Sequence, residues 1–82
     1  MTREDVLKSI ELAQKGDQSA KELIVKNNLG LVWSIVHRFK NNYYDKEDLF
    51  QIGCIGLMKA INNFDVHYGV QFSTYAYYYG GN

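Results

Sequence analysis

The stretch from Asp45 to Phe64, DKEDLFQIGCIGLMKAINNF, decides the fold because it carries a helix start signal and two distinct helical faces. Asp45 is a favourable N-cap residue, and the Asp48 carboxylate can reach back to a free backbone N–H and complement the helix dipole. Apolar and small residues then recur at spacings of three and four: Leu49, Gly53, Gly56, Leu57, Ala60, Ile61 and Phe64. We predict that this core stripe packs inward and that its two glycines let another helix approach closely.

A second face of the same helix is polar at both ends and apolar in its middle. We call it the ridge, and it consists of Asp48, Gln51, Ile52, Ile55, Lys59 and Asn62. A monomer rarely leaves two β-branched apolar side chains side by side in water, so the ridge predicts a partner-binding surface. The pattern leaves a second interpretation equally open, in which another helix of the same domain covers the ridge.

The composition predicts a single small all-α domain. A chain of 82 residues has room for three or four short helices around one core. It contains no proline and few clustered β-branched residues, which favours helices. Neither a signal peptide nor a run of roughly 20 apolar residues is present, so we expect a cytoplasmic protein without a membrane partner. The lone Cys54 is interpreted as a small apolar side chain.

Helices are also predicted on the N-terminal side of the organising stretch. Thr2 and Asp5 form a capping box, Gly16 suits a left-handed C-cap, and Asp17 caps a second helix. The apolar spacing then continues to Phe39. Residues 18–40 are therefore either one long helix that bends near Asn27–Gly30 or two helices joined there.

A last helix is predicted after the loop that ends at Gly69. Ser73 or Thr74 can cap this helix, and Tyr75, Tyr78 and Tyr79 would share one of its faces. An aromatic cluster of this kind can stack unpaired bases without a strong charge field. A pocket for a flipped base could be built from Phe64, Gln71, Ser73, Thr74 and Tyr75. The alternative is that these aromatic residues form the core, although three successive tyrosines cannot all be buried.

Charge and residue chemistry argue against an enzyme and against a general duplex-binding protein. The formal net charge is zero, whereas duplex binders are usually basic. His37 and His67 are isolated, and no residues have metal-ligand spacing or form a phosphate-binding glycine loop. We therefore expect no catalytic residues, no metal and no cofactor.

Several motifs in order resemble domain 2 of the bacterial RNA polymerase sigma factors of the sigma-70 family. The resemblance runs from Gly16 to Ala76 and rests on these blocks: Gly16-Asp17 with Ala20 and Leu23, Asn28-Leu29 with Leu31-Val32, Asp48 to Gly53 with Ile55 to Leu57, Phe64-Asp65, and Phe72 to Ala76. The segments DLFQIGCIGLMKAI and FSTYA are most similar to the corresponding segments of sporulation sigma factors of the forespore type.

The resemblance implies a helical domain that binds the clamp helices of the polymerase largest subunit and captures the non-template strand of the promoter −10 element. It assigns polymerase contacts to Asp48, Gln51, Ile52 and Ile55. It assigns a flipped base near the downstream end to Asn28 and Leu31, and the melting segment to Phe64, Gln71, Phe72, Ser73, Thr74 and Tyr75. Phe64 and Tyr75 would line the pocket for a flipped adenine, and Tyr78 and Tyr79 stand where primary factors have two tryptophans that wedge the duplex.

The chain departs from the family pattern in three ways. Ile52 replaces an acidic residue common on the polymerase-facing helix, and Gly30 replaces a basic residue near DNA. The family also continues beyond Tyr79 into a helix that reads the −10 duplex and a domain that reads the −35 element. We therefore expect residues 1–82 to be one region 2 domain and a fragment of a longer factor.

Two other functions remain open at this stage. The first is a protein-interaction module that binds polymerase or an anti-sigma factor through the ridge without capturing DNA. The second is a fragment of an unrelated helical enzyme, against which the lack of paired acid and base residues argues.

Overall fold

The computed structural model describes residues 2–38 and 44–80, and within these ranges the chain is all-α, as predicted. The described helices are α1 (Arg3–Gln14), α2 (Gln18–Asn27), α3 (Leu29–His37), α4 (Lys46–Asn63) and α5 (Phe72–Tyr79). The five helices of the described residues exceed the three or four expected. None of these helices is both long and apolar enough to cross a membrane.

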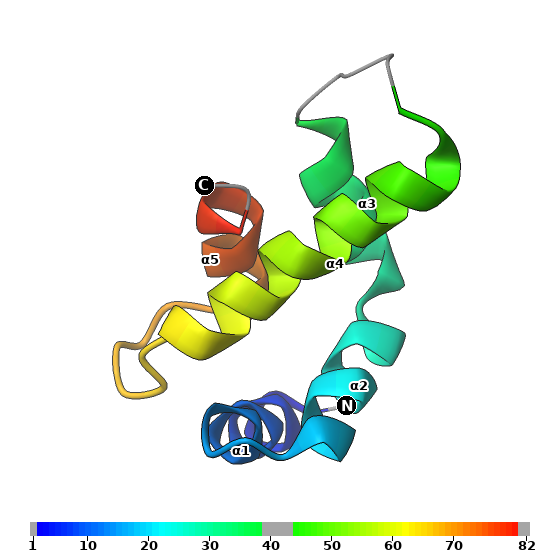
Figure 1. The fold of residues 1–82 in the computed structure, drawn as a ribbon. Coiled ribbons are helices and arrows are strands. Elements are labelled where there is room, and N and C mark those ends of the chain that lie inside the picture. The colour runs from blue at the N-terminus through cyan, green and yellow to red at the C-terminus, as the bar shows by residue number, and fades with distance from the viewer. Residues whose placement is uncertain (1, 39–43, 81–82) are drawn as a thin grey trace.

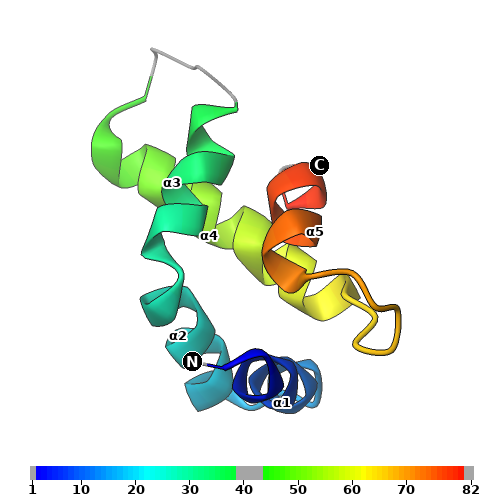
Figure 2. The ribbon, with the colours of Figure 1, turned by 180° about the vertical axis from the view of Figure 1, so that it is seen from behind.

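Helix α4 is the element on which the other four pack. It runs diagonally through the molecule, with α1 and α2 below it and α3 and α5 against its other sides (Figures 1 and 2). The Asp45 carboxylate accepts a hydrogen bond from the Asp48 N–H at 2.9 Å, which confirms the predicted N-cap. Gly53, Gly56, Leu57, Ala60, Ile61 and Phe64 are buried, and Leu49 is half-buried. The core stripe was therefore predicted correctly.

The two glycines of the core stripe are points of close helix approach. A Cβ atom on Gly53 would lie 2.6 Å from Val36 Cγ2 on α3. A Cβ atom on Gly56 would lie 2.9 Å from the carbonyl carbon of Gly80 and nearer still to its oxygen. Neither glycine could be replaced by a residue with a side chain without displacing its neighbour, because real Cβ contacts are longer.

Helix α1 begins and ends, and helix α2 begins, where the sequence predicts. Thr2 Oγ1 accepts from the Asp5 N–H, and Asp5 Oδ2 accepts from the Thr2 N–H, both at 3.2 Å. These hydrogen bonds with Thr2 lower the pKa of the Asp5 carboxyl. Gly16 has φ +100°, and Asp17 Oδ1 accepts from the Ala20 N–H at 3.1 Å. α1 and α2 therefore form a closely connected pair.

The helical conformation is interrupted at Asn28, between α2 and α3, so the two-helix interpretation is correct for residues 18–38. Asn28 has φ −131° and ψ 36°, which lies outside the helical region. The side-chain amides of Asn27 and Asn28 donate to the carbonyl oxygens of Leu23 and Ile24, each at 2.8 Å. The bond to Ile24 satisfies one of the last four carbonyl groups of α2, which have no donor within the helix. The last two residues of the predicted segment, 39 and 40, lie outside the described ranges.

Helix α5 begins earlier than predicted. Its N-cap is Gln71, which makes no side-chain capping bond, and Ser73 and Thr74 lie in its first turn. The assignment of Ser73 or Thr74 as the cap was wrong because Phe72 is buried against Phe64, with ring centroids 5.4 Å apart, and this contact holds Phe72 in the helix. At the other end, the Arg38 guanidinium donates to the Tyr77 carbonyl oxygen and lies over the Tyr77 ring.

Candidate functional site

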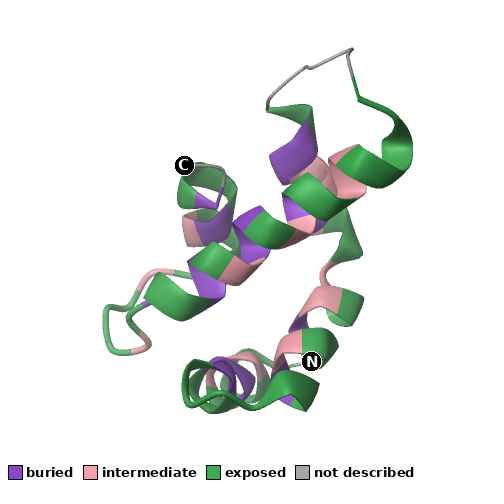
Figure 3. Cartoon of the chain, in the orientation of Figure 1, coloured by how far each residue is buried: buried purple, intermediate pink, exposed green. Residues whose placement is uncertain are grey.

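The ridge on α4 is exposed along its whole length. Ile52 and Ile55 expose 37% and 57% of their surface, and the four polar ridge residues are exposed as well. Figure 3 shows exposed positions in green along α4, and within the described ranges no helix covers the ridge residues. The interpretation that another helix of this domain buries the ridge is therefore wrong for residues 2–38 and 44–80.

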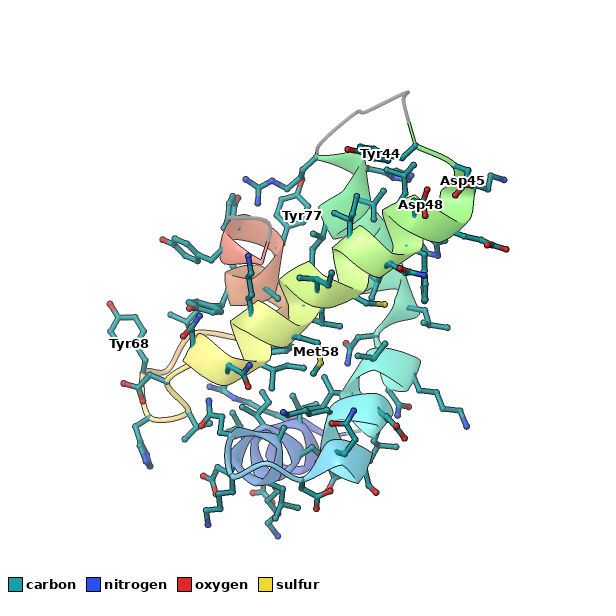
Figure 4. The ribbon with its side chains drawn as sticks, in the orientation of Figure 1. Tyr44, Asp45, Asp48, Met58, Tyr68 and Tyr77 are labelled. Atoms are coloured by element: carbon teal, nitrogen blue, oxygen red, sulfur yellow. The ribbon has the colours of Figure 1, made fainter. Side chains whose placement is uncertain are left out.

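Two mainly apolar pockets that the sequence analysis missed lie between α4 and the α2–α3 segment, and we call them together the apolar groove. One part has a volume of about 470 Å³ and includes Val25, Leu29, Cys54 and Met58. A second part of about 390 Å³ includes Trp33 and Phe50, whose ring centroids are 5.5 Å apart. Figure 4 shows Met58 on the side of α4 that faces α1 and α2.

The sequence did contain one signal for this groove. Cys54 and Met58 are four residues apart and therefore lie on the same face of α4. As predicted, Cys54 is a half-buried apolar side chain, and burial raises the pKa of its thiol. The groove therefore offers the neutral thiol and the thioether of Met58 as part of an apolar surface next to the ridge.

An open aromatic pocket lies at the C-terminal end of α4. Its volume is about 400 Å³, and it is lined by Asn63, Phe64, Asp65, Tyr68, Val70, Thr74, Tyr75, Tyr78 and Tyr79. The ring centroids of Phe64 and Tyr75 are 5.3 Å apart, and those of Tyr75 and Tyr79 are 5.0 Å apart. Tyr75, Tyr78 and Tyr79 share one face of α5, as predicted.

The aromatic residues divide between core and surface, so both earlier interpretations hold in part. Phe64 and Phe72 expose only 4% and 6% of their surface and belong to the core. Tyr75 is half-buried, whereas Tyr78 and Tyr79 expose 57% and 59%. A planar ligand in this pocket would therefore meet the tyrosines, with Phe64 behind them. Any DNA contact of Phe72 stays a prediction, since its ring is buried.

A smaller pocket of mixed character joins α1, the α2–α3 break and the start of α5, and we call it the polar pocket after the polar half of its lining. It measures about 270 Å³ and is lined by Arg3, Val6, Leu7, Asn28, Val70, Gln71, Phe72 and Ser73. The fold thus brings Asn28 close to Gln71 and Ser73, which are distant in sequence. Leu31 is not part of this lining and packs half-buried against the core. Sequence reasoning missed Arg3, which adds a guanidinium to this pocket.

The comparisons with known proteins give the family. The sequence pattern described as Sigma-70 region 2 matches residues 24–80, well over half of the chain. The chain belongs to the sigma-70 region 2 family. The predicted resemblance to sigma-70 family domain 2 is therefore confirmed.

Three relatives show how far the similarity extends. The RNA polymerase sigma-F factor of Bacillus subtilis is 53% identical over 72 residues, which are 88% of this chain and 28% of that protein. The RNA polymerase sigma-G factor of Bacillus subtilis is 54% identical over 66 residues, 80% of this chain and 25% of that protein. The sigma-G factor of Clostridium acetobutylicum is 51% identical over 63 residues, 77% of this chain and 24% of that protein. The chain thus spans about a quarter of the length of these relatives.

The part that matches sigma-70 region 2 contains every site residue named from the sequence. Asn28, the ridge and the tyrosines of α5 all lie between residues 24 and 80. Helix α1, with Arg3 and Gln14, lies before the matched segment. The similarity to the sigma-F factor extends further, because 72 of the 82 residues of this chain must include Gln14.

Proposed function

We propose that this chain is a sigma factor module for transcription initiation, which binds core RNA polymerase and holds the unpaired non-template strand of a promoter −10 element. The observation that supports the proposal best is the division of α4. The ridge residues to which polymerase contacts are assigned, Asp48, Gln51, Ile52 and Ile55, lie within the first ten residues of α4, and the C-terminal end of α4 forms a wall of the aromatic pocket. One rigid helix would thus connect a protein-binding surface with a base-binding site.

The polymerase side of the proposal rests on shape and polarity. Asp48 and Gln51 supply polar groups next to the exposed isoleucines, and the apolar groove extends this surface toward Trp33 and Met58. A ridge flanked by a groove suits a helical partner, whose apolar side chains would enter the groove. We assign this partner to the clamp helices of the polymerase largest subunit. An anti-sigma factor would compete for the same surface.

The DNA side of the proposal uses two pockets. The aromatic pocket would stack a flipped adenine against Tyr75, and the polar pocket would hold a second unpaired base near Asn28, Gln71 and Ser73. Stacking on aromatic rings contributes about 1–3 kcal/mol per base and needs no strong charge field. Because the net charge is zero, we expect weak DNA binding by the chain alone and strong binding on polymerase.

A titration with a fluorescent oligonucleotide tests the proposal. Core polymerase loaded with the chain should bind a labelled non-template −10 strand, and an oligonucleotide with an abasic site in place of the flipped adenine should bind more weakly. The chain without polymerase and polymerase without the chain serve as controls. Binding to polymerase without any capture of DNA would favour the alternative, a module that acts only through protein contacts.

The ridge should contribute directly to polymerase binding. We expect the double substitution Asp48→Ala with Gln51→Ala to weaken binding of a clamp-helix fragment by about 1–2 kcal/mol, since single interface positions rarely exceed this. Both side chains are exposed, so the fold should be spared. Fluorescence anisotropy with a labelled fragment measures the change, and Glu11→Ala, an exposed substitution on α1, is the matched control. Equal affinity of the double variant and the control would remove the ridge from the interface.

Arg3 should contact a DNA phosphate beside the polar pocket. Each phosphate contact to a single strand contributes about 0.7 to the slope of log affinity against log salt concentration. Arg3→Ala should therefore reduce this slope by about that amount for the complex of chain, polymerase and oligonucleotide. Lys8→Ala, an exposed α1 cation outside the pocket lining, should leave it unchanged. An identical slope in both variants would contradict a phosphate contact of Arg3.

A further inference from the structure

The side chain of Gln14, the last residue of α1, is bound to the C-terminal end of α4. Its Nε2 group donates to the Ile61 carbonyl oxygen at 2.9 Å and to the Phe64 carbonyl oxygen at 2.7 Å. The two bonds connect residues 47 and 50 positions apart in the sequence. One amide group thus uses both of its hydrogens on a helix end that belongs to a different part of the chain.

Helix α4 lacks the usual ways of completing its C-terminus. Its last turn contains no basic residue, and its C-cap, Phe64, is extended, with φ −71° and ψ 130°. No glycine in a left-handed conformation follows directly, because the next glycine with a positive φ is Gly69. The last carbonyl groups of a helix need donors from outside it. Gln14 supplies them for Ile61 and for the C-cap residue itself.

The carbonyl that Gln14 holds belongs to a wall of the aromatic pocket. The Phe64 ring makes edge contacts with Phe72 and Tyr75, at centroid distances of 5.4 and 5.3 Å. Tyr75 in turn contacts Tyr79. A displacement of the Phe64 backbone would therefore move the ring against which Tyr75 is packed.

We propose that Gln14 is a positioning residue for the aromatic pocket, which it holds in a base-binding geometry by capping α4 at Phe64. This inference rests on the proposed function and extends it to α1, which lies before the segment that matches the family. It assigns to α1 a part in base capture without any contact between Gln14 and DNA.

The test compares variants at position 14 by two independent measurements on the full chain. Gln14→Ala removes both hydrogen bonds, and Gln14→Glu keeps the length but supplies only acceptors at neutral pH. Gln14→Lys keeps donors of sufficient reach and places a cation at a helix C-terminus, where it is favourable. Thr2→Ala is the matched control, because it removes the capping box at the other end of α1 and leaves α4 untouched.

The first measurement is the nuclear magnetic resonance spectrum of the tyrosine rings in the chain alone. The Tyr75 ring signals should shift in Gln14→Ala and Gln14→Glu and stay close to the parent values in Gln14→Lys and Thr2→Ala. The Tyr44 ring, exposed at the opposite end of α4, is the internal reference. Circular dichroism confirms folding, and if Gln14→Ala unfolds, the comparison of Gln14→Glu with Gln14→Lys at low temperature decides.

The second measurement is the preference of the polymerase-bound chain for adenine over an abasic site at the flipped position. We expect Gln14→Ala to reduce this preference at least about fivefold, because fivefold is the usual effect of a single lost hydrogen bond and this variant loses two, and we expect Gln14→Lys to retain the preference. The inference would be overturned if Gln14→Ala left the Tyr75 signals unchanged. It would also be overturned if the parent chain preferred adenine and Gln14→Ala kept the same preference. Equal effects of Thr2→Ala would overturn it as well. If the parent chain itself does not discriminate, the proposed function fails, and the ring signals alone decide whether Gln14 positions the pocket.

Discussion

Replacing Gly56 by alanine should force α5 away from α4 and lower the free energy of unfolding by about 1–3 kcal/mol. The added Cβ atom would overlap the Gly80 carbonyl group, whose carbon would be 2.9 Å away, and it would also press on Ile35 Cγ2 at 3.3 Å. A backbone carbonyl cannot turn aside as a flexible side chain can. In a domain of this size, each kcal/mol corresponds to roughly 4–8 °C in melting temperature, so thermal unfolding followed by circular dichroism should show a clear decrease.

Gly30→Ala is the matched control for this experiment. No atom lies within 4 Å of a Cβ at position 30, and its φ is not positive, so alanine fits there. We expect a gain of about 0.4–1 kcal/mol from the reduced freedom of the unfolded chain. If Gly56→Ala had the melting temperature of the parent, α5 would not pack on α4 as described. The assignment of the core stripe and the ridge to opposite faces would then fail as well.

The separation of the two proposed binding surfaces has a measurable consequence. Asp48 and Asn63 are 15 positions apart on α4, which corresponds to about 22 Å along the helix axis at roughly 1.5 Å per residue. Figure 4 shows Asp48 near one end of α4 and Tyr68 beyond the other. Effects of substitutions this far apart usually add. Substitutions of Asp48 and Gln51 should therefore weaken polymerase binding without changing the preference for adenine.

Local patterns were sufficient to predict α4 and the N-terminal caps. A side chain three residues from its backbone partner acts within one helical turn, so Thr2, Asp17 and Asp45 could be assigned from spacing alone. The exposure of Ile55 and the burial of Gly56 likewise follow from their places on a single helix. These predictions needed no knowledge of the other helices, and the structure confirms them.

Features that depend on contacts distant in sequence could not be predicted in this way. The start of α5 is determined by the contact of Phe72 with Phe64, which overrides the capping preference of Ser73. The polar pocket needs α1 to approach Asn28, and the α4 cap needs Gln14 to reach residues about fifty positions away. The number of helices depended on whether the chain stays helical at Asn28, and the sequence pattern allowed both a continuous helix and a break there.

Tyr75 should provide most of the stacking surface for an unpaired adenine. Its ring is half-buried between Phe64 and Tyr79, at centroid distances of 5.3 and 5.0 Å, and it lines the aromatic pocket. Tyr75→Ala should weaken binding of the −10 strand by the polymerase-bound chain by about 1–3 kcal/mol, whereas Tyr75→Phe should change it little because the π-face remains. The measurement is a fluorescence titration of a labelled non-template oligonucleotide.

Two controls separate stacking from packing at this residue. Tyr44→Ala removes an exposed ring near the start of α4, far from the pocket, and should leave DNA binding unchanged. Circular dichroism of each variant reports folding, and the oligonucleotide with an abasic site reports the part of the affinity that comes from the base.

If Tyr75→Ala stayed folded and bound the adenine strand as tightly as the parent, the tyrosine face of α5 would not be the base-binding site. If Tyr75→Ala unfolded the domain while Tyr75→Phe kept both fold and adenine preference, the ring would belong to the core. The base would then have to stack on Tyr78 or Tyr79, where alanine substitutions should reproduce the loss.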